Sequence, residues 1–271
     1  MHVYVLDMEA LGVDEVDEDY NRLVDKSRDI SYTNLNKKLL EDFKRKLDSS
    51  PTPLSDKYKR VLIDRFNQGT PAAKLLLAKH MPDKNIIDIN QLTDEQRKRY
   101  GIKEKTKGMN IAKAVFVDAE YDITNPRSPG KTFFHEQGHM LDNTGLGGVD
   151  VRNELRDLAA KDLDNLRERM TDAEIKALLK GAERDRLSSV SDIISGLTYD
   201  PVTNTIGIEG HWKHKSEYWQ AVLNIGGAGV EAFAHLLEAQ FNPERRAVLQ
   251  EYFPTMTHKF DEIIEEARRA L

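Results

Sequence analysis

Residues His135-Glu136-Gln137-Gly138-His139 form an H-E-x-x-H sequence, and this short stretch decides most of what the chain predicts about its fold and chemistry. On a helix, residues four positions apart lie on one face about one turn from each other, so both imidazoles can reach a single metal ion. Glu136 stands beside the first histidine, where it can take a proton from a metal-bound water. The motif therefore predicts a zinc site that supports hydrolysis. The alternative is a surface helix with two unrelated histidines.

The sequence before and after the motif predicts a strand, a turn and then a helix. Residues 114–117 are apolar and β-branched, as in a strand, and residues 125–130 are rich in proline and glycine. Thr132 is the expected N-cap of the motif helix, and Gly145 is its expected end. We expect the edge of the strand at 114–117 to pair with an extended substrate through main-chain hydrogen bonds.

A third protein ligand has to come from elsewhere in the chain, because a catalytic zinc ion takes three protein ligands and a water molecule. Asp142 is the nearest acid, but it stands almost a turn beyond His139, so a hydrogen bond to a ligand histidine suits it better. Glu231 is the stronger candidate, since it shares a polar helical stripe with His235 and Glu238 beside an apolar stripe. Taken alone, that stripe could equally be a solvated face.

A family resemblance points to the same ligand set. The residues 135–142, the sequence Glu231-Ala232-Phe233-Ala234 and residues 252–254 resemble the catalytic domain of anthrax lethal factor and its relatives. They are more similar still to lethal-factor-like metallopeptidase domains that phages and mobile elements encode beside head-morphogenesis proteins, as are the segments 191–196, 210–211 and 216–219. The resemblance covers about residues 114–271. It implies a gluzincin-type peptidase in which Glu231 is the third zinc ligand.

The chain departs from that family where a tyrosine stabilises the transition state. The toxin has this tyrosine seven residues before its glutamate, and here that position is Asn224. Tyr218 is the expected replacement, because the glycine-rich stretch 224–229 can absorb the difference in spacing. A phenol opposite Glu136 could donate a hydrogen bond to the oxyanion. The alternative donors are His211, His214 and His235, and ordinary core packing is the other interpretation of Tyr218.

Composition limits the classes of protein to consider. A chain of 271 residues with 39% hydrophobic and 32% charged residues is typical of a soluble protein that buries a core. The absence of cysteine excludes disulfides, thiolate nucleophiles and cysteine-ligated zinc. A net charge of −6 argues against general nucleic-acid binding. No apolar run is long enough for a membrane span and no signal-peptide pattern is present, so we expect a location in the host cytoplasm or in a virion.

The expected fold class is α+β and predominantly helical, with a small sheet beside the motif helix as in zincins. We divide the chain into an acidic N-terminal arm (1–32), a helical region (33–110) and a zincin-like catalytic region (111–271), the last two packed as one unit. Patterns outside the motif predict further elements: helices at 55–67, after Thr70-Pro71 and after Thr93, a helix pair at 151–187 broken near Thr171, a hairpin at 197–208, and helices near 229–241, 244–251 and 257–270.

The sequence thus predicts a zinc-dependent endopeptidase with one zinc ion per chain, bound by His135, His139 and Glu231. Glu136 is the expected general base and then general acid, and Tyr218 the expected oxyanion donor. The expected partner is a protein or peptide substrate, with a phage-head or mobile-element protein as a further partner, and neither nucleic acid nor membrane. Two other functions fit the motif: a virion-associated binding protein with a structural or vestigial zinc site, and a regulatory peptidase that cleaves phage repressors.

Overall fold

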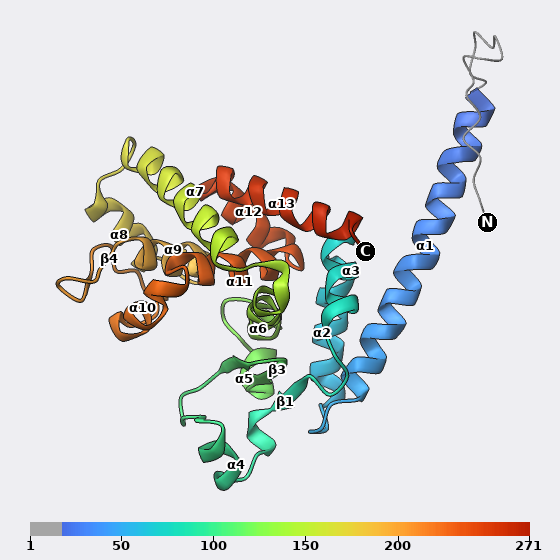
Figure 1. The fold of residues 1–271 in the computed structure, drawn as a ribbon, viewed down its shortest axis with the longest axis horizontal. Helices are drawn as coiled ribbons and strands as arrows, with labels where there is room; N and C mark the ends of the chain where they lie inside the picture. The colour runs from blue at the N-terminus through green and yellow to red at the C-terminus, as the bar shows by residue number, and fades with distance from the viewer. Residues whose placement is uncertain (1–17) are drawn as a thin grey trace.

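The computed structural model describes residues 18–271, and the surroundings of side chains from residue 33 onward. This part of the chain is predominantly helical with two small sheets, in agreement with the predicted α+β class (Figure 1). Of the predicted acidic arm, residues 1–17 lie outside the described residues. Helix α1 (Glu18–Asp48) passes through position 32 without a break and extends away from the body of the molecule in Figure 1.

The first three helices form one wall of the core. Helices α2 (Asp56–Gln68) and α3 (Pro71–His80) begin after Ser55 and Thr70, whose hydroxyls accept hydrogen bonds from main-chain N–H groups, as the sequence predicted. Phe43 of α1 stacks on Phe66 with ring centroids 4.3 Å apart. The same ring lies against the aromatic rings of the motif helix, so these helices support that helix from behind.

A three-stranded sheet lies on the other side of the motif helix. Its order is β1 (Ile86–Asp88), β3 (Ala114–Val117) and β2 (Gly108–Ile111), with β1 parallel and β2 antiparallel to β3. The strand predicted at 114–117 is confirmed, but both of its edges are already paired. The expectation that its edge would meet a substrate is therefore wrong, because β2 covers it on that side.

The motif helix α6 (Lys131–Leu141) begins two residues earlier than predicted. Gly130 precedes it in the left-handed conformation, with φ of 78°. The capping role predicted for Thr132 is taken by Asp122 of α5 (Ala119–Ile123), whose carboxylate accepts from the main-chain N–H groups of Thr132 and Phe133 at 2.8 and 3.2 Å. The α-helix ends at Leu141 and continues as a π-helical turn, η3 (Asp142–Leu146), in which Gly145, the predicted end, leaves the helical conformation with φ of 107°.

Most of the remaining chain is helical. A capping box at Thr171 confirms the predicted break between α7 and α8. Every residue of helix α11 is buried, so α11 is the central helix of the C-terminal part of the chain (Figure 1). The elements are α7 (Val149–Arg167), α8 (Asp172–Lys180), α9 (Ser188–Leu197), the hairpin β4 (Tyr199–Asp200) and β5 (Thr205–Ile206), α10 (Ser216–Val222), α11 (Ala228–Gln240), α12 (Pro243–Tyr252) and α13 (Pro254–Arg269).

The described residues also form three short helices, η2 (Ile89–Gln91), α4 (Asp94–Arg99) and η4 (Leu223–Ile225). Thr93 caps α4, as predicted. The largest hydrophobic cluster runs from Leu39 of α1 to Ile264 of α13 and includes Phe133, Phe134, Met140 and Leu141 of α6. Among the helices of residues 18–271, none has the length and apolar content that crossing a bilayer requires.

Candidate metal centre

Helices α6 and α11 cross at Gly138, inside the H-E-x-x-H motif. A Cβ atom at this position would lie only 2.7 Å from the Cα atom of Ala234 and 3.0 Å from its carbonyl oxygen. The missing side chain therefore allows the two backbones to approach closely. Because Glu231 lies about one turn before Ala234 on α11, the crossing brings its carboxylate next to the two motif histidines.

The carboxylate of Glu231 faces both imidazoles. Its Oε2 atom lies 3.1 Å from Nε2 of His135, and its Oε1 atom lies 3.5 Å from Nε2 of His139. The two imidazole rings are nearly perpendicular, with centroids 4.8 Å apart. Glu231 is only 1% exposed, whereas the two histidine side chains are open at 13% and 15%. The three predicted ligands thus converge at the floor of an opening.

Two of the distances between these donor atoms are close to those of a zinc site. Zinc ligands about 2.0–2.1 Å from a tetrahedral centre are about 3.4 Å from one another, and the two separations above lie on either side of that value. Glu231 Oε2 is buried and accepts no hydrogen bond from the described residues, although His135 Nε2 is close. A bound cation would satisfy this oxygen. Nδ1 of His135 is also buried and has no hydrogen-bond partner among the described residues.

The charge states of the ligands suit a metal ion. Burial lowers the pKa of His139 to about 4, so this imidazole is neutral at pH 7 and its nitrogen can bind a cation. Burial alone would raise the pKa of Glu231, but the neighbouring His214 and His139 hold it well below its usual range. Glu231 therefore carries a full negative charge in a buried place.

Glu136 lies beside the ligands, not among them. Burial raises its pKa to about 7, and the charge of Glu231 adds to this shift against the opposing effect of His135. A carboxyl group with a pKa near neutrality can both take and return a proton. Its side chain is confined by β2, since a Cβ atom on Gly108 would lie 2.8 Å from Glu136 Oε1.

Tyr218 reaches the site from α10. Its hydroxyl donates a very short hydrogen bond to Oε1 of Glu231, and burial raises the pKa of the phenol well above its usual range. The ring stacks on the imidazole of His214 with centroids 4.0 Å apart. Tyr218 therefore reaches Glu231 although it lies six residues before Asn224, the position at which the family has its tyrosine.

The other histidines considered as oxyanion donors differ in position. His214 lines the opening, and its Nδ1 atom lies 3.0 Å from both oxygens of Asp192. Burial alone would lower the pKa of His214, but Asp192 and Glu231 raise it to about 10. His211 is exposed and stands against Trp212, and it lines neither of the cavities at the site. The structure therefore places His214, but not His211, next to Tyr218.

Behind the ligands lies a buried polar layer, of which the sequence indicated His235 and Glu238 but not Asp192 or Lys131. The ring of His235 packs against His135, with centroids 4.5 Å apart, and its Nε2 atom lies 3.2 Å from Asp192 Oδ2. Its Nδ1 atom lies 3.4 Å from Nζ of Lys131, which forms an ion pair with Glu238. Two sets of three donor residues have ligand atoms within 4.8 Å of one another, namely His135, Glu231 and His235, and Asp192, His214 and Glu231; the donor atoms of His135, His139 and Glu231 are less close together. Because both nitrogens of His235 already have partners, we assign it to this supporting layer.

Asp142 also has a different partner from the one expected. Both of its oxygens accept from Nε of Arg152, at 2.9 and 2.8 Å, instead of holding a ligand histidine. Arg152 also donates to the carbonyl of Ile225 at 3.0 Å, just before the glycine-rich segment that leads into α11. A Cβ atom on Gly229 would lie 1.9 Å from the carbonyl oxygen of Arg152, so glycine is required there. This pair anchors the start of the Glu231 helix.

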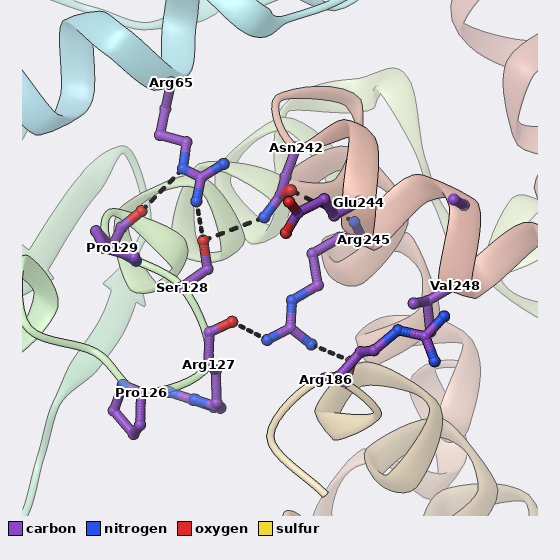
Figure 2. A pocket seen from close by; sticks show the side chains of 11 residues that line it. Arg65, Pro126, Arg127, Ser128, Pro129, Arg186, Asn242, Glu244, Arg245 and Val248 are labelled. Atoms are coloured by element: carbon purple, nitrogen blue, oxygen red, sulfur yellow. Dashed lines mark hydrogen bonds between the residues drawn. The ribbon is translucent and has the colours of Figure 1, made fainter. Parts of the chain in front are cut away.

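The loop before α6 is held by arginines (Figure 2). The buried Arg245 of α12 donates to the carbonyl oxygens of Arg127 and, at 2.6 Å, of Arg186. Arg65 of α2 donates to the hydroxyl of Ser128 and, at 3.1 Å, to the carbonyl of Pro129. These bonds fasten the segment 125–130 to two other helices, and so they fix where the motif helix begins.

Two cavities open at the site. The first, of about 300 Å³, is lined by Gly108, Met109, Asn110, His135, Glu136, His139, Asp142, Asn143, Arg152, His214, Tyr218, Ile225, Val230 and Glu231. The second, of about 180 Å³, is lined by Lys105, Lys107, Gly108, Arg127, Lys131, Thr132, His135, Glu136, Asp192, His214 and His235. They share Gly108, His135, Glu136 and His214, so together they form one cleft on both sides of the candidate metal centre.

Comparisons of the chain with models of protein families, with curated proteins and with solved structures found no match. The chemistry of this cleft is therefore inferred from its own residues and their geometry.

Proposed function

We propose that this protein is a zinc-dependent endopeptidase of the lethal-factor-like, gluzincin type. The observation that supports the proposal most is the position of Glu231, whose two oxygens lie 3.1 and 3.5 Å from the Nε2 atoms of the H-E-x-x-H histidines. Donors of this type and number are those of catalytic zinc sites with three protein ligands. When bound there, zinc supplies a Lewis acid and lowers the pKa of water toward neutrality.

The residues of the chain then divide the work of peptide hydrolysis. Glu136 takes the proton of the attacking water and passes it to the nitrogen of the leaving amine, for which a pKa of about 7 is suitable. The single O–H of Tyr218 turns from Oε1 of Glu231 to the carbonyl oxygen of the scissile bond and donates to it as negative charge develops. The ring of Tyr218 stacks on His214, whose imidazole is in turn held by a hydrogen bond to Asp192.

An extended substrate has a place to bind. Strand β2 is an edge strand of the sheet, and its residues Gly108, Met109 and Asn110 line the first cavity beside the candidate metal centre. A peptide that pairs with this edge would gain main-chain hydrogen bonds of the kind that sheet edges offer.

The first test is metal content. We expect about one zinc ion per purified chain, and we expect Glu231→Ala and His139→Ala to lose the ion or bind it much more weakly, because each removes one of three ligands. Elemental analysis after dialysis against a weak chelator measures this. His258→Ala, an exposed histidine in α13, is the matched control and should keep its zinc. Full zinc retention in Glu231→Ala would remove Glu231 from the ligand set and leave His235 as the third ligand.

A second test concerns Tyr218. We expect Tyr218→Phe to lower kcat and kcat/KM together by about 10²–10³-fold, as other single oxyanion donors do, with unchanged zinc content. His214→Gln is the comparison, since its ring lines the same cavity. Loss of zinc from Tyr218→Phe would show that the phenol only positions Glu231, and a larger loss of kcat in His214→Gln would transfer the donor role to His214.

A further inference from the structure

The second cavity of the cleft has a basic lining, whereas the first does not. We propose that this second cavity binds an acidic side chain, aspartate or glutamate, of a peptide substrate close to the scissile bond. The inference rests on the proposed function and adds a substrate class to it. His214, a cation of this lining, is paired with Asp192. The lysine and arginine side chains that line the cavity are four, namely Lys105, Lys107, Arg127 and Lys131.

Two of these cations are neutralised within the protein and two are not. Lys131 forms an ion pair of 2.5 Å with Glu238, and Lys107 forms one of 2.7 Å with Asp118. Lys105 and Arg127 have no carboxylate partner among the residues that the structure describes. They are therefore the charges that remain for a ligand.

Arg127 is held ready for an anion. Its carbonyl oxygen accepts from the buried Arg245, and its own Nε atom donates to Asn125 Oδ1 at 3.2 Å (Figure 2 shows the main-chain contact). Its guanidinium lies over the ring of Trp212, 4.6 Å from the centroid, and Trp212 is itself fixed by a hydrogen bond of 2.7 Å to Asp185. A planar guanidinium whose position is already set matches a carboxylate at little further cost in entropy.

Acidic groups in the lining do not cancel this charge. Asp192 is occupied by the two histidines His214 and His235. Glu136 lies at the boundary that both cavities share, beside the candidate metal centre.

In the first cavity, by contrast, Asp142 and Arg152 pair with each other, and Met109, Ile225 and Val230 give apolar surface. The charge asymmetry therefore predicts acid selection on one side of the scissile bond only.

The experiment uses the zinc-loaded wild-type protein and a proteome-derived peptide library whose cleavage products are identified by mass spectrometry. We expect Asp and Glu to be enriched at one subsite next to the cleavage point. For a cleaved peptide and its Glu→Gln analogue, we expect kcat/KM to favour the acid by about tenfold or more, as for a charge-assisted hydrogen bond. Absence of acid enrichment at every subsite would overturn the proposal.

Variants that change the charge of the second cavity test whether the preference for acidic side chains arises there. Arg127→Gln and Lys105→Glu should each lower the Glu/Gln ratio severalfold, and Lys105→Glu should shift the enrichment toward Lys and Arg. Lys103→Glu is the matched control, an exposed lysine of the same loop that lines neither cavity, and it should keep the wild-type ratio. A ratio that Lys103→Glu lowers as much as Lys105→Glu would show a general charge effect and contradict the proposed subsite.

A binding measurement separates failure of this inference from failure of the proposed function. Zinc-loaded Glu136→Gln protein is titrated into a labelled extended peptide with a single glutamate and into its Glu→Gln analogue, both chosen independently of cleavage, and fluorescence anisotropy gives the two affinities. Wild-type protein that cleaves nothing contradicts the proposed function, while tighter binding of the acid peptide still supports the subsite. Equal binding of the two peptides overturns the subsite even where cleavage is observed.

Discussion

Replacement of Glu136 by glutamine is expected to lower peptide cleavage by roughly 10²–10⁴-fold while zinc content and thermal stability stay unchanged. Glutamine has nearly the same shape, so it fits the space between α6 and β2 where Gly108 leaves room for this side chain. It cannot take a proton, however, and proton transfer is the role that the burial and raised pKa of Glu136 suit. The substitution does not alter the proposed ligands His135, His139 and Glu231, so zinc binding should be kept.

The measurement is kcat/KM on a peptide found by library screening, with zinc determined on the same preparation. Glu217→Gln, an exposed acid of α10 outside both cavities, is the control and should cleave at the wild-type rate. Undiminished cleavage by Glu136→Gln would contradict the mechanism. Failure of the wild-type protein to cleave any peptide of a broad library would favour the alternative of a binding protein with a structural zinc site.

Elements that depend on neighbours in the sequence could be predicted from it. The starts of α2, α3, α4 and α8 follow from Ser55, Thr70, Thr93 and Thr171, each of which caps its own helix through a local hydrogen bond. Strand β3 follows from a run of apolar and β-branched residues. The start of α6 could not be predicted in the same way, because its N-terminal N–H groups are bound by Asp122, ten residues before Thr132.

The site depends on contacts between distant segments, and these set the limits of the prediction. Glu231 could be selected because the motif lacked a third ligand and because of the family resemblance, and the crossing at Gly138 does bring it to the histidines. Asp192 and Arg152 were missed as site residues, since a buried carboxylate between two histidines has no periodic pattern. Strand β2 was missed because Gly108-Met109-Asn110 has low strand propensity and is ordered by pairing with β3.

The ion pair between Lys131 and Glu238 ties the motif helix to the helix of Glu231. Both side chains are only 2% exposed, and Lys131 also donates to Ser189 Oγ at 3.1 Å. Burial lowers the pKa of Lys131 to about 8, against the opposing effect of Glu238. A buried charge of this kind is tolerated because its partner is present, so loss of either partner leaves the other charge uncompensated.

We therefore expect Lys131→Met to lower the free energy of unfolding by about 3–5 kcal/mol, the range for breaking a buried ion pair. The double variant Lys131→Met/Glu238→Leu should recover most of that loss, because no buried charge remains. Chemical denaturation at fixed zinc concentration measures both.

The control is the exposed pair of Lys44 and Glu41, where Lys44→Met should change stability by less than about 1 kcal/mol. A loss in Lys131→Met no larger than in this control would show that the pair carries no such penalty. A double variant less stable than Lys131→Met alone would show instead that Glu238 stabilises α11 through His235, whose Nδ1 atom lies 3.6 Å from the Glu238 carboxylate, independently of the lysine.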